Sequence, residues 1–108
     1  MSFKVYIIKC LKTDKCYISY TASKRDDYNP IRYLHSLYEK DKSKYTLLGE
    51  SIDEHGFKEH KYAFIKTELN QEEASKLTNE YREKLKDRSL HVEVKKDNYF
   101  EEELKLLL

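Results

Sequence analysis

Two segments rich in β-branched and aromatic residues lie close together at the start of the chain, and they limit what it can fold into more than any other feature. Residues 3–10 read FKVYIIKC, and residues 16–20 read CYISY. The intervening LKTDK supplies the polar residues of a turn. This arrangement predicts a β-hairpin that opens the domain. Tyr6 and Tyr17 then stand at matching places on its two arms.

Capping residues and helical spacing predict two helices after the hairpin. Asn29 and Pro30 are typical of an N-cap and a first helical position. Ile31, Leu34 and Tyr38 follow at helical spacing. A shorter helix is expected around KYTLLGESIDEHGF, where Leu47, Leu48 and Ile52 share one side and Gly56 is the C-terminal stop.

The second half predicts a third strand and a third helix. HKYAFIKT alternates in the manner of a strand. Asn70, with Glu73 three residues later, forms an Asn variant of the capping box and opens a helix through about Lys86. Its buried face is expected to carry Ala74, Leu77, Tyr81 and Leu85. Farther on, SLHVEV is typical of a short strand, and YFEEELKLLL of a terminal helix or ordered tail.

Length and composition exclude several classes of protein. A chain of 108 residues fits one domain, and its formal charge of +1 does not demand a polyanionic partner, so a nucleic-acid surface must be local. No apolar run reaches the roughly 20 residues of a membrane span, and no signal peptide is visible, so we expect an intracellular protein. With only two glycines, Gly49 and Gly56, P-loop and Rossmann sites are excluded.

The order hairpin, helix, short helix, strand, helix resembles that of the GIY-YIG nuclease superfamily. KVY, ending at Tyr6, stands in the place of GIY, and YIS, starting at Tyr17, in the place of YIG. HGFKEHKYAFIKT resembles the family segment in which a helix ending in HG or YG leads into the third strand. EEASKLTNEYREKL resembles the helix that carries the metal-binding glutamate. The resemblance covers roughly residues 3–86.

The resemblance implies a fold and a domain layout. We expect an α+β domain with a small three-stranded, mostly antiparallel sheet flanked by helices. Residues 1–88 would form this GIY-YIG-like domain, and residues 89–108 a C-terminal strand and helix packed on it.

The resemblance also implies a catalytic site. One hairpin tyrosine, Tyr6 or Tyr17, would activate the attacking water, an arginine of the first helix would stabilise phosphate charge, and a glutamate would hold one Mg²⁺ or Mn²⁺ ion. These are the parts that phosphodiester hydrolysis needs. Arg32 and His35 are the candidates on the first helix.

Three positions depart from the family pattern. Ser19 replaces the glycine of YIG. The family's arginine falls four residues before the histidine, where this chain has Ile31, and Arg32 comes one residue later, about 100° around the helix. Thr78 occupies the position expected for the glutamate, and its neutral hydroxyl is a poor ligand for a hard cation. Glu80 is the remaining candidate for a metal ligand.

Two functions stay open at this point. The first is a nucleic-acid endonuclease, with Lys9, Lys24 and Arg25 on phosphates and with catalysis impaired or lost. The second is an inactive domain of the same fold that binds nucleic acid or another protein. DNA is favoured over RNA as the partner, no membrane is expected, and a homodimer through the C-terminal segment is plausible.

Overall fold

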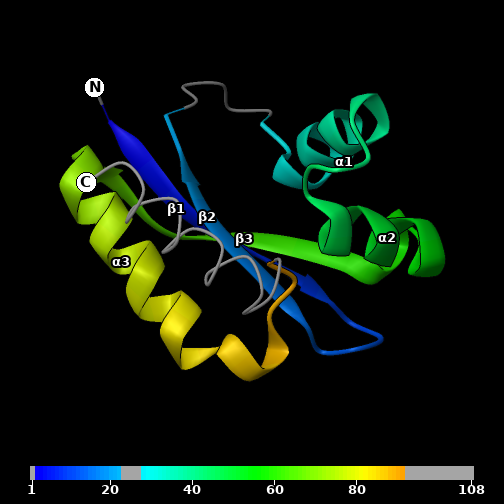
Figure 1. The fold of residues 1–108 in the computed structure, drawn as a ribbon. Coiled ribbons are helices and arrows are strands. Elements are labelled where there is room, and N and C mark those ends of the chain that lie inside the picture. Colours follow the sequence, from blue (N-terminus) through cyan, green and yellow to red (C-terminus); the bar gives the residue numbers. More distant parts are fainter. Residues whose placement is uncertain (1, 23–27, 92–108) are drawn as a thin grey trace, which may run out of the picture.

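The computed structural model describes residues 2–22 and 28–91, which form three strands and three α-helices (Figure 1). Two short 3₁₀ helices, η1 and η2, follow α2 and α3. In chain order the elements are β1 (Phe3–Cys10), β2 (Cys16–Thr21), α1 (Pro30–Lys40), α2 (Thr46–His55), η1 (Phe57–Glu59), β3 (His60–Leu69), α3 (Gln71–Lys84) and η2 (Lys86–Arg88).

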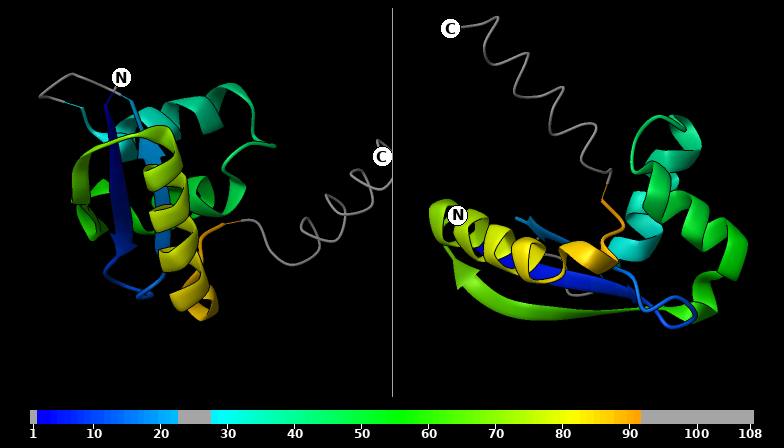
Figure 2. Two further views of the ribbon diagram at one scale, coloured as in Figure 1. Left: turned by 90° about the vertical axis from the view of Figure 1, so that its left-hand side faces the viewer. Right: turned by 60° about the horizontal axis from the view of Figure 1, so that its bottom comes forward.

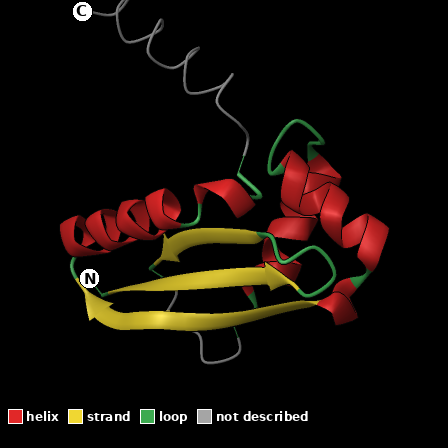
Figure 3. Cartoon of the chain, turned by 90° about the horizontal axis from the view of Figure 1, so that it is seen from below, coloured by secondary structure: helices red, strands yellow, loops and turns green. Residues whose placement is uncertain are grey.

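The three strands form one antiparallel sheet in the order β2-β1-β3, so the first strand is the central one. Figure 3 shows β3 at the edge opposite β2. The register places Tyr6 opposite Ser19, and Ile8 opposite Tyr17. The prediction of an α+β domain with a three-stranded, mostly antiparallel sheet is therefore confirmed.

Side chains along each strand point alternately to the two faces of the sheet, and each face carries its own apolar cluster. Tyr6 and Ile8 of β1 and Tyr17 of β2 pack with α1 and α2. Val5 of β1 and Ile18 of β2 pack instead under α3. This division follows from the strand period, since neighbouring side chains point to opposite faces. Figure 2 shows α3 lying against the sheet, while α1 and α2 stand together near one end.

The helix starts agree with the capping residues. The Asn29 side chain accepts hydrogen bonds from the backbone N–H groups of Ile31 and Arg32, and Pro30 begins α1. At α3 both hydrogen bonds of the capping box between Asn70 and Glu73 are present. Each cap satisfies N–H groups that have no partner within the helix.

Three hydrogen bonds link the outer edge of β2 to later parts of the chain. The Leu90 N–H donates to the Cys16 carbonyl at 2.7 Å. The Ile18 N–H donates to His91 Nε2 at 3.0 Å, and Arg82 Nε donates to the Ile18 carbonyl at 2.9 Å. This edge is thus protected against pairing with another strand. The rest of the predicted C-terminal extension, residues 92–108, lies outside the described residues.

Candidate functional site

Tyr6 and Tyr17 lie on the sheet face that α1 and α2 cover. Because Ser19 is the cross-strand neighbour of Tyr6 and lies two residues after Tyr17, its side chain is placed between them, on the same face. Its hydroxyl interacts with both phenols. Both tyrosines are buried, with 3% and 7% of their surface exposed. Half-buried Ser19 therefore forms a hydroxyl cluster with the two buried phenols.

Burial sets the acid–base character of these tyrosines. It raises the pKa of Tyr17 to about 12, and nearby Tyr45 adds to the shift. Burial also raises the pKa of Tyr6 well above its usual value. A general base works best when its pKa lies near the operating pH. Both phenols therefore stay protonated at neutral pH and are poor general bases there.

Tyr17 has two neighbours that come from the end of the described chain. The His91 ring stacks on Tyr17 with centroids 4.2 Å apart. The Arg82 guanidinium acts on both rings, since its charge lowers the pKa of Tyr17 and adds to the lowering of the pKa of His91. The largest cause for His91 is burial, and its pKa falls to about 4. The cation next to Tyr17 is thus Arg82 of α3.

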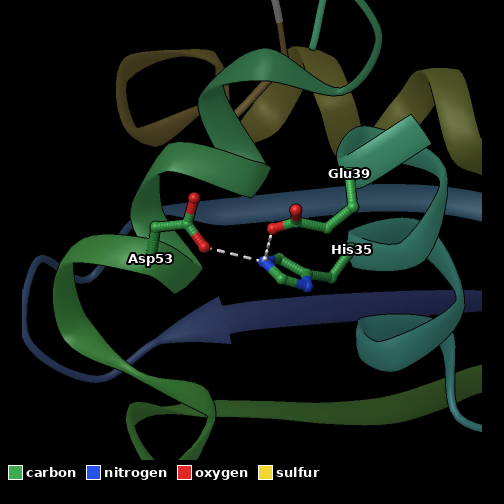
Figure 4. Close-up of side chains that lie close together, drawn as sticks. All are labelled: His35, Glu39 and Asp53. Atoms are coloured by element: carbon green, nitrogen blue, oxygen red, sulfur yellow. Dashed lines mark hydrogen bonds and ion pairs between the residues drawn. The ribbon is translucent and has the colours of Figure 1, made fainter. Parts of the chain in front are cut away.

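Arg32 and His35 lie together around Phe57. The Arg32 guanidinium stands 4.9 Å from the centre of the Phe57 ring, and the His35 ring meets the same ring edge-on at 5.0 Å. Figure 4 shows His35 Nε2 directed at two carboxylates, 2.8 Å from Asp53 Oδ1 and 3.4 Å from Glu39 Oε1. The four predicted catalytic side chains therefore form two pairs, with Tyr6 and Tyr17 around Ser19 and Arg32 and His35 around Phe57.

Among the described residues, the side chains around His35 have ligand atoms close enough together to hold a metal ion. We call these side chains the His35 group. The nitrogen of His35 and the carboxylate oxygens of Glu39 and Asp53 lie within 4.8 Å of one another. Nitrogen and carboxylate ligands suit Zn²⁺ or Mn²⁺. These groups already satisfy one another, and Lys42 Nζ lies 3.3 Å from Glu39 Oε2. Contacts between α1 and α2 account for the arrangement without an ion.

Thr78 and Glu80, the positions considered for the catalytic glutamate, lie on α3. This helix packs over the sheet face opposite to Tyr6 and Tyr17. Thr78 is buried, with 1% of its surface exposed, and Glu80 is exposed. Within the described residues the Thr78 hydroxyl has no hydrogen-bond partner. An unpaired buried hydroxyl costs free energy because it has lost its water.

Thr78→Val is expected to raise the free energy of unfolding by about 1 kcal/mol. Valine keeps the shape of threonine and replaces the unpaired hydroxyl by a methyl group, while the two residues have similar helix propensities. Urea unfolding of the two proteins at neutral pH measures the difference. A less stable variant would mean that the hydroxyl has a partner in solution.

The predicted phosphate contacts have different surroundings. Lys9 forms an ion pair with Asp14 across the hairpin turn, with Nζ 2.7 Å from Oδ1. Asp14 also pairs with Arg88, and the two cations hold the pKa of its carboxyl below the usual value. Lys9 is therefore engaged within the fold. Lys24 and Arg25 lie outside the described residues.

A shallow hollow lies where the start of α1 meets η1 and the start of β3. Asn29, Arg32, Phe57, Lys61 and Tyr62 are among the residues that line it. Two of these side chains are cationic, and two are exposed aromatic rings. Such a combination suits a ligand with both negative charge and flat rings.

Sequence reasoning missed the exposed rings of β3 and the residues that cover β2. KYAFIK, residues 61–66, carries its aromatic residues between lysines, and this pattern was a usable signal for a nucleic-acid surface. Arg82 and His91 offered no comparable signal, because their neighbours on β2 are more than 60 residues away in sequence.

No family model matches this chain, and no curated protein or solved structure shows significant similarity to it. Within the described residues, no helix has the length and apolar character needed to cross a membrane.

Proposed function

We propose that this chain is a nucleic-acid-binding domain with a GIY-YIG-like architecture and without an efficient phosphodiesterase site. The observation that carries the proposal is the surface formed by the hollow and β3, where Arg32 and Lys61 stand beside the exposed rings of Phe57 and Tyr62. Cations next to rings offer contacts to phosphates and to bases together.

The arrangement of the remaining site residues supports binding over catalysis. Tyr6 and Tyr17 are buried and stay protonated at neutral pH. Arg32 and His35 are held around Phe57, and Glu80 extends into solvent from α3. A hydrolytic site needs a nucleophile activator, a metal ligand and a charge-stabilising cation around one phosphate.

Binding of a labelled DNA oligonucleotide of about 15 nucleotides, followed by fluorescence anisotropy, tests this function. We expect saturable binding that weakens as salt rises from about 50 to about 200 mM, because phosphate contacts release counterions. Lys61→Gln is expected to lower both the affinity and the slope of the salt dependence, by about one phosphate contact. Lys86→Gln, on η2, is the matched control and should leave both unchanged. No binding of either single-stranded or duplex DNA or RNA would refute the proposal.

A metal-dependent endonuclease is the second candidate, favoured by the shared sheet face of Tyr6 and Tyr17. It predicts nicking of supercoiled plasmid in Mg²⁺ or Mn²⁺, and loss of nicking in Tyr17→Phe while the variant stays folded. Wild type and variant are compared in the same metal, with folding checked by circular dichroism. Nicking that survives in Tyr17→Phe would point to a contaminating nuclease.

A further inference from the structure

Five aromatic rings follow one another from α1 to β3. We call them the ring series, and consecutive centroids lie 5.9 to 6.5 Å apart. In spatial order they are Tyr33, Tyr28, Tyr6, Phe64 and Tyr62. Tyr6 is the buried middle ring, while Tyr33, Phe64 and Tyr62 have 52%, 37% and 38% of their surface exposed. The series thus presents ring surface to solvent on both sides of a fixed centre.

The position of Phe64 and Tyr62 on the sheet explains their exposure. Phe64 lies opposite Tyr6, and Tyr62 opposite Ile8, so both rings project from the α1 and α2 side of the sheet. β3 is an edge strand, and nearly all of its residues are exposed or half-buried. The Tyr62 hydroxyl donates to the Tyr28 carbonyl at 3.4 Å and links the strand to the segment before α1. The rings are therefore held in place without being covered.

The cations near the ring series form no ion pair with another residue of the described part of the chain. Lys4 Nζ lies 5.3 Å from the centre of the Phe64 ring. Lys61 lines the hollow together with Tyr62 and Arg32. Lys66 pairs with Val5, whose side chain packs under α3, so it lies on the opposite face of the sheet. In residues 2–22 and 28–91, the cations with no carboxylate partner include Lys4, Arg32, Lys61 and Lys66, whereas those with one include Lys9, Lys42, Lys86 and Arg88.

Exposed rings beside unpaired cations match the chemistry of a single strand of nucleic acid. The bases of a single strand can stack on aromatic side chains, and its phosphates attract lysine and arginine. A duplex keeps its base faces stacked inside and offers a protein mainly its backbone and groove edges. Stacking on Phe64 and Tyr62 therefore requires unpaired bases.

We propose that the ring series, with Lys4, Lys61 and Arg32, binds single-stranded nucleic acid by stacking bases on Phe64 and Tyr62. This proposal rests on the proposed function and narrows its substrate to unpaired strands. Binding of this kind tolerates many sequences, because every base has an aromatic face.

Anisotropy titrations of one labelled DNA strand, alone and annealed to its complement, test the proposal on the full chain. Phe64→Leu should weaken single-strand binding about tenfold, since leucine keeps the apolar bulk and loses the ring face. Phe64→Tyr should retain most of the affinity. Leu11→Ala, at an exposed apolar residue of the hairpin turn, is the control for general surface changes. Circular dichroism confirms that each variant is folded.

The outcomes separate this inference from the proposed function. Preferential single-strand binding that Phe64→Leu weakens and Phe64→Tyr restores supports it. Equal binding of both DNA forms, unchanged in Phe64→Leu, overturns the stacking inference and leaves the proposed function standing. If neither form of DNA or RNA binds, both are overturned. A loss of self-association in Phe64→Leu, without nucleic-acid binding, would instead assign the ring series to a contact between copies of the chain.

Discussion

Gly49→Ala is expected to lower the free energy of unfolding by about 2 kcal/mol. A Cβ atom at this position of α2 would overlap the ring of Tyr38 on α1. Tyr38 is buried, and Lys42 Nζ stands 4.2 Å from the centre of its ring, so the ring has little room to move. Overpacking of this kind costs about 3 kcal/mol, and alanine returns about 1 kcal/mol through its higher helix propensity. Urea unfolding measures the net loss.

A double-mutant cycle attributes this loss to the contact with Tyr38. In a Tyr38→Leu background the added methyl group should cost much less, because the ring that it meets is gone. Gly56→Ala is the matched control. Gly56 has a φ of +88° and open space around its Cβ direction, so its substitution should cost the same free energy in both backgrounds. Equal costs of Gly49→Ala in the two backgrounds would show that α1 and α2 do not meet there.

Acidification is expected to destabilise the fold through His91. His91 Nε2 accepts the Ile18 N–H, its ring stacks on Tyr17, and Arg82 stands nearby, so protonation would remove an acceptor and place two cations together. Its pKa is about 4 in the folded protein and about 6.5 in the unfolded chain. The unfolded state therefore takes up the proton first, and stability present above about pH 6.5 is lost as the pH falls towards 4.

We expect the free energy of unfolding to fall by about 2 kcal/mol. This is less than the full pKa shift of His91 would give, because its ring is only partly buried and solvent screens the charge. Urea unfolding at about pH 7 and about pH 4.5 measures it. In His91→Gln the loss between the two pH values should shrink, since the amide oxygen accepts the same N–H and does not titrate. His55→Gln, at the C-terminal end of α2, is the control and should behave as wild type. A loss of the same size in His91→Gln would assign the pH dependence to other groups.

Much of the fold could be predicted from local signals. The Asn29-Pro30 start of α1 and the capping box of Asn70 and Glu73 are contained within a few residues, and both occur in the structure as expected. The expected buried face of α3 is another local property, since Ala74 is buried and Leu77, Tyr81 and Leu85 pack against the same cluster.

The candidate site was harder to predict because it depends on contacts between distant segments. Arg32 stands one residue from the position expected for the family's arginine, and this offset turns it about 100° away from buried Ile31 and out to the Phe57 ring. Arg82 and His91 contact β2 across more than 60 residues of sequence, so both contacts depend on the tertiary fold. The exposure of Phe64 depends on β3 being an edge strand, and strand order is a tertiary property.

The proposed function is binding of nucleic acid without efficient cleavage. Its most direct test is one titration of a labelled single strand with the full chain in Mn²⁺, in which anisotropy reports binding and gel electrophoresis of the same samples reports strand length. We expect saturable binding of a strand that remains intact. A strand that is not bound would contradict the proposed function, and so would metal-dependent cleavage that Tyr17→Phe abolishes.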